Sequence, residues 1–295
     1  MLHGPASLPQ SADAELDSVL HSRDGVVVGA FRCPTAHPRF TDSGPIQNDI
    51  FVFPRSSVCI RHAGGPSFVA DQCVATVYNR GQIYDRRAVA DEGDRSDWFA
   101  VPRAAALEAV LAHGLEPGPD GPFSFPFVGV SDESYLAQRR LFRRVQQGMA
   151  ARAIEEEVYA LLDDVIFQAA TGVRRGKAAS RRETGSRGIR EVGEAVRSLI
   201  AARFDEDWPL ARLSEHFGVS AFCLCRAFRK ATGTTIHRYL LTLRLRSALD
   251  RLEHPEADIT ALALDLGFSS HSHFTALFRR SFRETPSACR RSLGA

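Results

Sequence analysis

The stretch Leu210–Phe228, which reads LARLSEHFGVSAFCLCRAF, decides the fold of the C-terminal third of this chain. It opens with an apolar stripe at helical spacing, formed by Leu210, Leu213 and Phe217. Gly218 follows where a tight turn between two helices favours a residue that tolerates positive φ. Ser220 is a typical N-cap for the next helix, whose buried face is predicted to be Leu224 and Phe228, four residues apart. The stretch therefore predicts a helix-turn-helix unit.

The same order of features returns at Ile259–Phe278, which reads ITALALDLGFSSHSHFTALF. An apolar stripe precedes Gly267, Phe268 follows as the apolar residue of the turn, and Phe274 and Phe278 are again four residues apart. A single pattern of this kind is weak evidence, because many helical hairpins turn at a glycine. Two copies, about 50 residues apart, indicate a domain with two helix-turn-helix units.

The residues after Gly188 show no strand pattern at all. Their apolar periodicity predicts six helices, at 189–204, 210–217, 221–231, 236–252, 259–265 and 272–282.

The front of the chain has a different pattern. Stretches rich in Val, Ile, Phe and Tyr, with Gly and Pro between them, predict strands at 26–28, 49–61 and 67–78. They indicate a small β barrel or sandwich, which the Pro-rich and Gly-rich segment 116–126 closes. From Ser131, a plausible N-cap, apolar residues recur at steps of three, four and seven, so we expect two amphipathic helices that break near Gly148.

These patterns divide the chain into four parts. Residues 1–130 are predicted to form a β-rich domain, 131–170 a helical pair, 171–188 a flexible basic linker and 189–295 an all-α domain with the two helix-turn-helix units. The linker carries six Lys and Arg residues against one Glu over residues 171–187, although the formal net charge of the whole chain is only +2. The helical pair could join two subunits or pack only on its own barrel, and the pattern leaves both open.

The chain has no apolar run of the roughly 20 residues that a membrane span needs, and its first ten residues do not resemble a secretory signal. We therefore expect a cytoplasmic protein with six reduced cysteines.

Residues 189–291 resemble the DNA-binding domain of the AraC/XylS family of transcription regulators. The resemblance is carried by a long ordered set: Leu210–Leu213, Gly218–Ser220, Leu224–Lys230, Thr232–Thr234, Tyr239–Leu240, Arg244–Arg246, Ala248, Ile259, Ala263, Gly267–Phe268, His273–Phe274, Phe278–Arg280 and Thr285–Ser287. It covers about a third of the chain. It implies seven helices in two subdomains joined by a rigid helix at 236–252, with two recognition helices in successive major-groove segments. It also implies that 189–295 is the DNA-binding domain, and that the β-rich front half is a regulatory domain, often a cupin-like barrel, that senses a ligand and dimerises.

The resemblance places base-reading residues on both recognition helices, at Phe222, Cys225, Arg226, His271, Ser272, His273 and Thr275. Residues expected to bind phosphates are Arg229, Lys230, Arg279 and Arg280. Arg226 is the strongest candidate for direct readout, because a guanidinium can donate two hydrogen bonds to guanine; the alternative is that it pairs with an acid of its own domain. Two departures from the family pattern stand out. Arg283 replaces a glycine that usually closes the second unit, and Ala276 stands where a basic residue is frequent.

The partners expected are double-stranded DNA, a second copy of the chain, RNA polymerase and a small-molecule effector. We expect no cofactor and no metal, since the cysteines and histidines of the front half lack metal-ligand spacing. The sequence has none of the motifs GxSxG, HExxH, GxGxxG and GxxxxGK[ST], so we do not expect an enzyme.

Several alternatives stay open. The front half could only dimerise or contact another protein, it could be a fused enzyme, or Cys225 could act as a thiol switch. A set of aromatic and arginine residues could line a ligand pocket or form the barrel core and rim: Phe51, Phe53, Arg55, Arg61, Tyr78, Tyr84 and Trp98.

Overall fold

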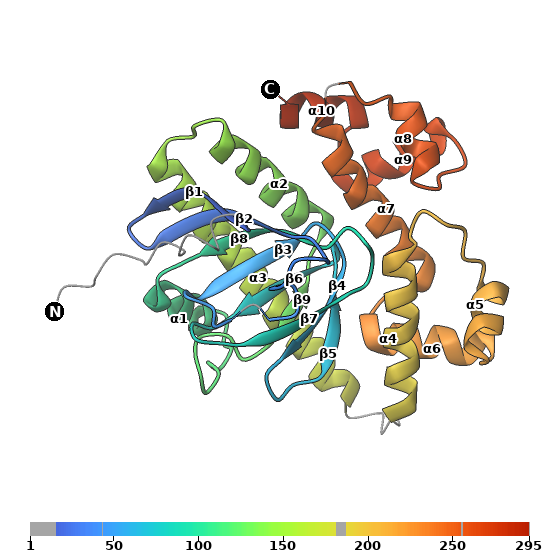
Figure 1. Ribbon diagram of the computed structural model, residues 1–295, viewed down its shortest axis with the longest axis horizontal. Coiled ribbons are helices and arrows are strands. Elements are labelled where there is room, and N and C mark those ends of the chain that lie inside the picture. The colour runs from blue at the N-terminus through green and yellow to red at the C-terminus, as the bar shows by residue number, and fades with distance from the viewer. Residues whose placement is uncertain (1–15, 43, 181–186, 255, 295) are drawn as a thin grey trace. The chain divides into compact units, whose positions relative to one another are not determined.

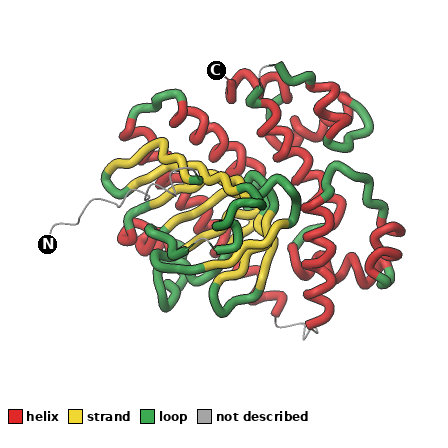
Figure 2. The backbone as a smooth tube through the Cα atoms, in the orientation of Figure 1, coloured by secondary structure: helices red, strands yellow, loops and turns green. Residues whose placement is uncertain are grey.

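The computed structural model describes residues 16–42, 44–180, 187–254 and 256–294. The chain forms two compact units, one made of residues 1–70 and 74–175 and the other of residues 71–73 and 176–295. Figure 2 shows the strands in the first unit, and helices joined by loops in the second. Among the described residues, no helix is both long enough and apolar enough to cross a membrane.

The described part of the first unit contains two antiparallel sheets (Figure 1). The six-stranded sheet has the order β1 (Asp17–Arg23), β2 (Val26–Cys33), β8 (Asp94–Ala100), β3 (Ile50–Pro54), β6 (Val74–Tyr78), β9 (Phe127–Gly129). The three-stranded sheet has the order β5 (Ser67–Ala70), β4 (Val58–His62), β7 (Tyr84–Ala88). One apolar core holds residues of both sheets, among them Val52, Ile60 and Phe68. The predicted mainly-β domain is therefore confirmed.

Two stretches predicted as continuous are each broken between the two sheets. Residues 49–61 form β3 and β4, and residues 67–78 form β5 and β6. Pro54 ends β3 because it has no N–H group to continue the ladder. The chain then turns through Ser56, whose hydroxyl donates to the carbonyl of Gly93 at 2.8 Å. The chain changes sheet at such corners.

The sequence analysis placed no helix before residue 131, and the helix α1 (Arg103–Ala112) corrects this. Its sequence is rich in Ala and Leu, which favour helices. Only Ala106 and Val110 are buried, so its apolar periodicity is short and easily missed.

The helical pair is confirmed as α2 (Asp132–Gln146) and α3 (Ala151–Ser180). Ser131 caps α2 by accepting a hydrogen bond from the Ser134 N–H at 3.0 Å, and Gly148 breaks the pair with φ of 86°. The buried face of α2 packs on its own unit, because Gln138 donates to the Asp97 carboxylate at 2.7 Å and Arg139 pairs with the same group.

The predicted linker needs correction. Helix α3 continues to Ser180, so residues 171–180 are helical. This segment has no proline and contains Ala, Arg and Lys, which sustain a helix even without an apolar face. The rest of the predicted linker up to the start of α4 at Arg187 falls on residues 181–186, which lie outside the described residues.

The described part of the second unit contains seven helices, the number that the family resemblance implies. They are α4 (Arg187–Ala202), α5 (Leu210–Phe217), α6 (Ala221–Thr232), α7 (Ile236–Leu252), α8 (Ile259–Asp265), α9 (His271–Phe282) and α10 (Pro286–Gly294). Six match the predicted helices within two residues at each end. The periodicity missed α10, which is short and begins at a proline, a residue favoured at the first helical position.

The side chain of Arg244 joins the two halves of this unit. From α7 it donates to the carbonyl of Phe204 at 2.6 Å, to that of Glu206 at 2.7 Å and to that of Gly267 at 2.7 Å. The first two carbonyls precede α5, and the third lies in the turn before α9. A Cβ on Gly267 would lie 2.5 Å from the carbonyl oxygen of Asp205, so only glycine fits this junction.

Residues 71–73, which connect β5 to β6, complete the second unit. The buried carboxylate of Asp71 accepts hydrogen bonds from Arg197 of α4 at 2.9 and 3.1 Å and from the hydroxyl of Tyr239 of α7 at 2.6 Å. Gln72 donates to the hydroxyl of Ser247 at 3.1 Å. Because Asp71, Arg197 and Tyr239 are all buried, each partner is needed to balance the others.

We predict that Arg244→Met destabilises the full-length protein by about 3 kcal/mol or more, because three carbonyl groups lose charge-assisted hydrogen bonds. Urea unfolding followed by circular dichroism measures this. The control is Arg251→Met on the same helix, where an exposed ion pair with Asp265 at 3.0 Å is lost; it should cost less than about 1 kcal/mol. Equal effects of the two variants would contradict the role given to Arg244.

Candidate functional site

The first helix-turn-helix unit consists of α5, a turn and α6. Gly218 ends α5 in the left-handed conformation, with φ of 63°, and the hydroxyl of Ser220 accepts a hydrogen bond from the Cys223 N–H at 3.2 Å. Leu213, Leu224 and Phe228 are completely buried, as predicted. Leu210 differs, because it is 40% exposed and lies outside this core.

Helix α4 packs closely behind α6. A Cβ on Gly193 of α4 would lie 2.5 Å from the carbonyl oxygen of Ala227, so the two backbones meet at that glycine. The opposite face of α6 is therefore the one that remains open to solvent. Phe222 is 77% exposed, Cys225, Arg226 and Arg229 are exposed, and Lys230 is half-buried.

The second unit repeats this construction with α8 and α9. Gly267 has φ of 77°, and the hydroxyl of Ser270 caps α9 by accepting from the His273 N–H at 3.1 Å. The core is a row of aromatic rings with centroids 4.6 to 5.5 Å apart, formed by Phe268, Phe274, Phe278 and Phe282. The row fixes the face of α9 that points inward.

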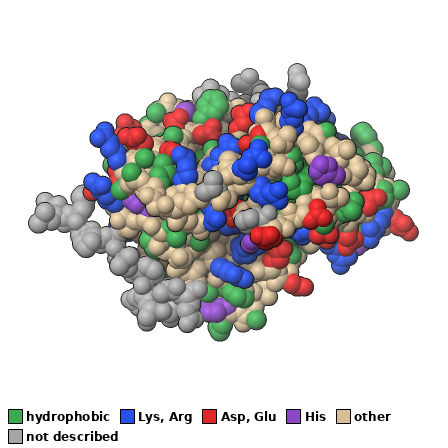
Figure 3. Space-filling view, turned by 90° about the horizontal axis from the view of Figure 1, so that it is seen from above, with side chains coloured by type: hydrophobic (Ala, Val, Ile, Leu, Met, Phe, Trp, Pro, Cys, Tyr) green, Lys and Arg blue, Asp and Glu red, His purple; other side chains and the backbone are tan. Residues whose placement is uncertain are grey.

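The candidate residues on α9 differ in their exposure to solvent. His271, Ser272, His273, Arg279 and Arg280 are exposed. Thr275 is half-buried, and its hydroxyl oxygen is buried without a hydrogen-bond partner among the described residues. The ring of His273 is held by the hydroxyl of Ser269, which lies 3.1 Å from Nδ1. On the face of the molecule drawn in Figure 3, Lys and Arg side chains form several clusters, coloured blue.

Arg283 closes α9 in the same way that Gly233 closes α6. Both residues are left-handed, with φ of 63° and 74° respectively. Arg283 is therefore left-handed at a position where the family usually has glycine, and it adopts this conformation at a cost.

The cysteines are all free, and Cys225 is exposed whereas Cys223 is half-buried. No group of three or more His, Cys, Asp or Glu side chains among the described residues is arranged to hold a metal ion.

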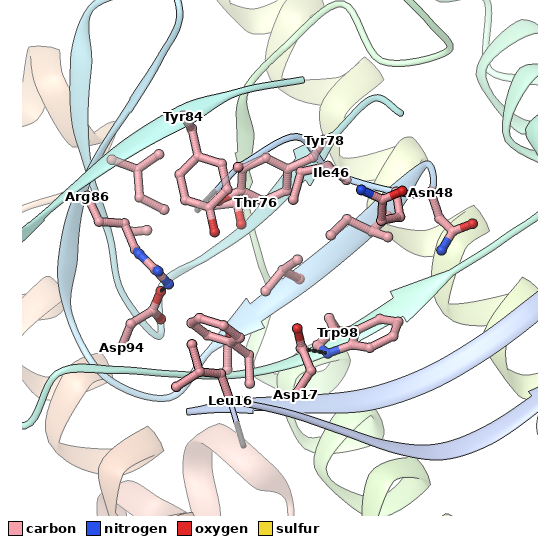
Figure 4. A pocket seen from close by; sticks show the side chains of 18 of the residues that line it. Leu16, Asp17, Ile46, Asn48, Thr76, Tyr78, Tyr84, Arg86, Asp94 and Trp98 are labelled. Atoms are coloured by element: carbon pink, nitrogen blue, oxygen red, sulfur yellow. Dashed lines mark hydrogen bonds and ion pairs between the residues drawn. The ribbon is translucent and has the colours of Figure 1, made fainter. Parts of the chain in front are cut away.

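The first unit contains a cavity of about 540 Å³ (Figure 4). Most of its lining is apolar or aromatic, and Phe31, Tyr78, Tyr84 and Trp98 contribute rings. Of the residues named as candidate pocket residues, Tyr78, Tyr84 and Trp98 line this cavity. In the core, Phe51 instead stacks on Phe99, and Phe53 contacts Phe99 edge to face. Arg61 forms a surface ion pair with Asp85.

Four charged residues of the cavity were not found from the sequence: Asp17, Arg39, Arg86 and Asp94. The buried guanidinium of Arg86 donates to Asp94 at 2.6 Å and to the carbonyls of Phe40 and Arg39 at 3.0 and 3.2 Å. The Asp17 carboxyl accepts a hydrogen bond from the indole N–H of Trp98 at 3.0 Å. One signal could have indicated Arg86. Tyr84 and Arg86 are two residues apart in a strand pattern, so they share one face of the strand and the arginine points inward with the tyrosine.

Burial raises the pKa of Asp17 to about 6, although the hydrogen bond from Trp98 acts in the opposite direction. Burial also raises the pKa of Asp94, against the effect of Arg86. Both shifts have desolvation of the charged carboxylate as their main cause.

Comparison with known proteins gives the relatives of the second unit. A family model for a helix-turn-helix domain matches residues 213–292. Over 74 residues the chain is 43% identical to the HTH-type transcriptional activator RhaS of Escherichia coli O139:H28 and of Escherichia coli SE11. That alignment covers 25% of this chain and 27% of each relative, so the chain spans about a quarter of the length of the curated relatives it matches.

Two solved structures that are similar to the chain come from Chromobacterium violaceum and Vibrio cholerae. A transcriptional regulator of Chromobacterium violaceum, with an AraC-type DNA-binding domain, is 30% identical over 37% of this chain and 96% of its own, with a TM-score of 0.33. The apo K231A form of ToxT from Vibrio cholerae is 11% identical over 92% of this chain and 98% of its own, with a TM-score of 0.37.

We predict that Arg283→Gly stabilises the protein by about 0.5–1 kcal/mol, because glycine adopts positive φ without steric cost. The matched control is Gly233→Ala. A Cβ at that position meets nothing within 4 Å, so the variant tests backbone conformation alone and should destabilise by a similar amount. Urea unfolding measures both, and a loss of stability in Arg283→Gly would show that the arginine side chain matters more than the backbone.

Proposed function

We propose, on the premise that residues 213–292 are a helix-turn-helix domain of the AraC/XylS family, that this chain is a sequence-specific DNA-binding transcription regulator. The observation that carries the proposal is the repeated unit itself. Two helices, α6 and α9, are each capped by serine, buried on one face and open on the other. Arg244 fixes the loop before the first unit to the turn of the second. Recognition helices held in this way can enter successive major-groove segments.

The proposed base contacts of α6 come from Phe222, Cys225 and Arg226. Their exposure supports this role. A guanidinium on the open face can donate two hydrogen bonds to the O6 and N7 atoms of guanine, and an exposed phenyl ring can pack on a thymine methyl group.

On α9 the proposed base contacts come from His271, Ser272, His273 and Thr275. Three of them are exposed, whereas Thr275 has its hydroxyl turned inward and would present its methyl group instead. With Ala276 in place of a basic residue, we infer that α9 contributes less to base specificity than α6.

The basic residues toward the ends of both helices are proposed to bind phosphates. They are Arg229, Lys230, Arg279 and Arg280. Phosphate contacts position a protein on the duplex without reading its sequence.

The front half is proposed to respond to a small molecule bound in the cavity. The chain itself connects the cavity to the second unit. Ala70 and Thr76 line the cavity. The segment between them includes residues 71–73, which belong to the second unit. A change at the cavity wall would therefore act on the residues that hold Arg197 and Tyr239.

Two protein partners complete the proposal. A second copy of the chain is proposed to bind along α3, where Tyr159 and Phe167 are 38% and 53% exposed. RNA polymerase is proposed because the RhaS relatives are named transcriptional activators. Because DNA is the target, we place the protein in the cytoplasm.

The test is selection of binding sites from a random duplex library by the full-length chain. We expect enriched sites with two short elements about one helical turn apart, roughly 34 Å. Arg226→Ala should cost about 1–3 kcal/mol in affinity and flatten the preference at one position of one element.

The matched control is Arg280→Ala, which removes an exposed arginine from α9. It should weaken binding to all sequences alike and lower the slope of log affinity against log salt by about 1. If the wild-type chain enriches no sequence, or if Arg226→Ala keeps the full preference, the proposed function is wrong.

A further inference from the structure

The cavity of the first unit has the size and lining of a small-molecule site. Its volume of about 540 Å³ falls in the usual range for such sites, roughly 300–1,000 Å³. In Figure 4, Tyr78 and Tyr84 lie on one side of the cavity, and Asp17 and Trp98 lie across from them. A flat apolar ring can pack between these aromatic walls.

The charged groups around the cavity fall into two kinds. Arg86 already has protein partners, because Nε, Nη1 and Nη2 each donate to a protein oxygen and its charge is paired with that of Asp94. Asp17 is different. One of its oxygens accepts the Trp98 indole N–H, and no Lys, Arg or His side chain of the described residues forms an ion pair with it.

The charges around the cavity favour a cationic ligand. Burial raises the pKa of the Asp17 carboxyl to about 6, and no Lys, Arg or His side chain of the described part of the chain forms a direct ion pair with it. Arg86 lowers this pKa and Asp94 raises it, and Arg39 also lines the cavity. A ligand ammonium group would supply the missing counter-charge, whereas a ligand carboxylate would add a third acid beside Asp17 and Asp94.

We infer that this cavity binds a small aromatic molecule that carries a protonated amine, with the ammonium group on the Asp17 carboxylate and the ring between Trp98 and the two tyrosines. The inference rests on the proposed function only in treating the ligand as an effector. Trp98 acts as a positioning residue here, because its indole holds one carboxylate oxygen and leaves the other for the ligand. Gly29 makes this arrangement possible, since a Cβ at that position would lie 2.4 Å from the indole ring.

The test compares probes that differ only in charge. Benzylamine, benzyl alcohol and benzoate, together with the corresponding 1-naphthyl series, are titrated into the full-length protein at pH 7.5 by isothermal calorimetry. We expect the amine of at least one series to bind about tenfold or more tightly than the alcohol, and the carboxylate to bind least. Equal affinities, a preference for the carboxylate or no binding by any probe would overturn the inference.

The variant Asp17→Asn keeps the shape of the side chain and removes its charge. It should lower the affinity for the amine about tenfold or more and change that for the alcohol by less than about twofold. Urea unfolding checks that the variant folds. A variant that folds and still prefers the amine would also overturn the inference, because the charge of Asp17 would then play no part.

The pH dependence gives a second readout. The amine probes stay protonated between pH 5 and 8, so their affinity should fall as the pH drops through about 6, where Asp17 takes up a proton. The decline should vanish in Asp17→Asn, and an identical decline in both proteins would count against the inference. Since these measurements use no DNA, a chain that binds the amine but selects no DNA site would refute the proposed function and leave the ligand class standing.

Discussion

The three hydrogen bonds of Arg244 are the interaction on which the second unit depends. They bring the carbonyls of Phe204 and Glu206, which precede the first helix-turn-helix unit, onto the same guanidinium as the carbonyl of Gly267 in the second. A buried cation shared by three acceptors allows little movement of any of them, because each broken bond leaves a polar group unsatisfied. Under the proposed function, α6 and α9 match the spacing of a duplex only if their separation is fixed, and this contact would supply that constraint.

The first unit also contains buried charged residues, and these serve two different purposes. Asp97 accepts a hydrogen bond from Gln138 and forms an ion pair with Arg139. These buried polar contacts hold α2 on the sheet. Arg86 and Asp94 form a matched pair in the wall of the cavity. Asp17 accepts a hydrogen bond from Trp98 but has no ion-pair partner among the described residues, and the proposed ligand would supply one.

The buried faces of α6 and α9 could be predicted from the sequence. The inward positions repeat every three or four residues, so Leu224, Phe228, Phe274 and Phe278 define the buried face, and most of the candidate DNA-contact residues lie on the exposed side. Lys230 and Thr275 are half-buried. Whether a threonine at the edge of a face turns its hydroxyl inward depends on the neighbouring helix, which periodicity does not describe.

The sequence by itself determined the two helix-turn-helix units, their caps at Ser220 and Ser270, and the division into a mainly-β front and a helical back, because each depends on contacts between residues close in the chain. Only the tertiary structure decided the cavity, the positions of Asp17 and Arg86 in its wall, and the place of Asp71 beside Arg197 and Tyr239. Those features depend on contacts between residues far apart in sequence. The local pattern around a single charged residue in a strand does not indicate which residue it will contact.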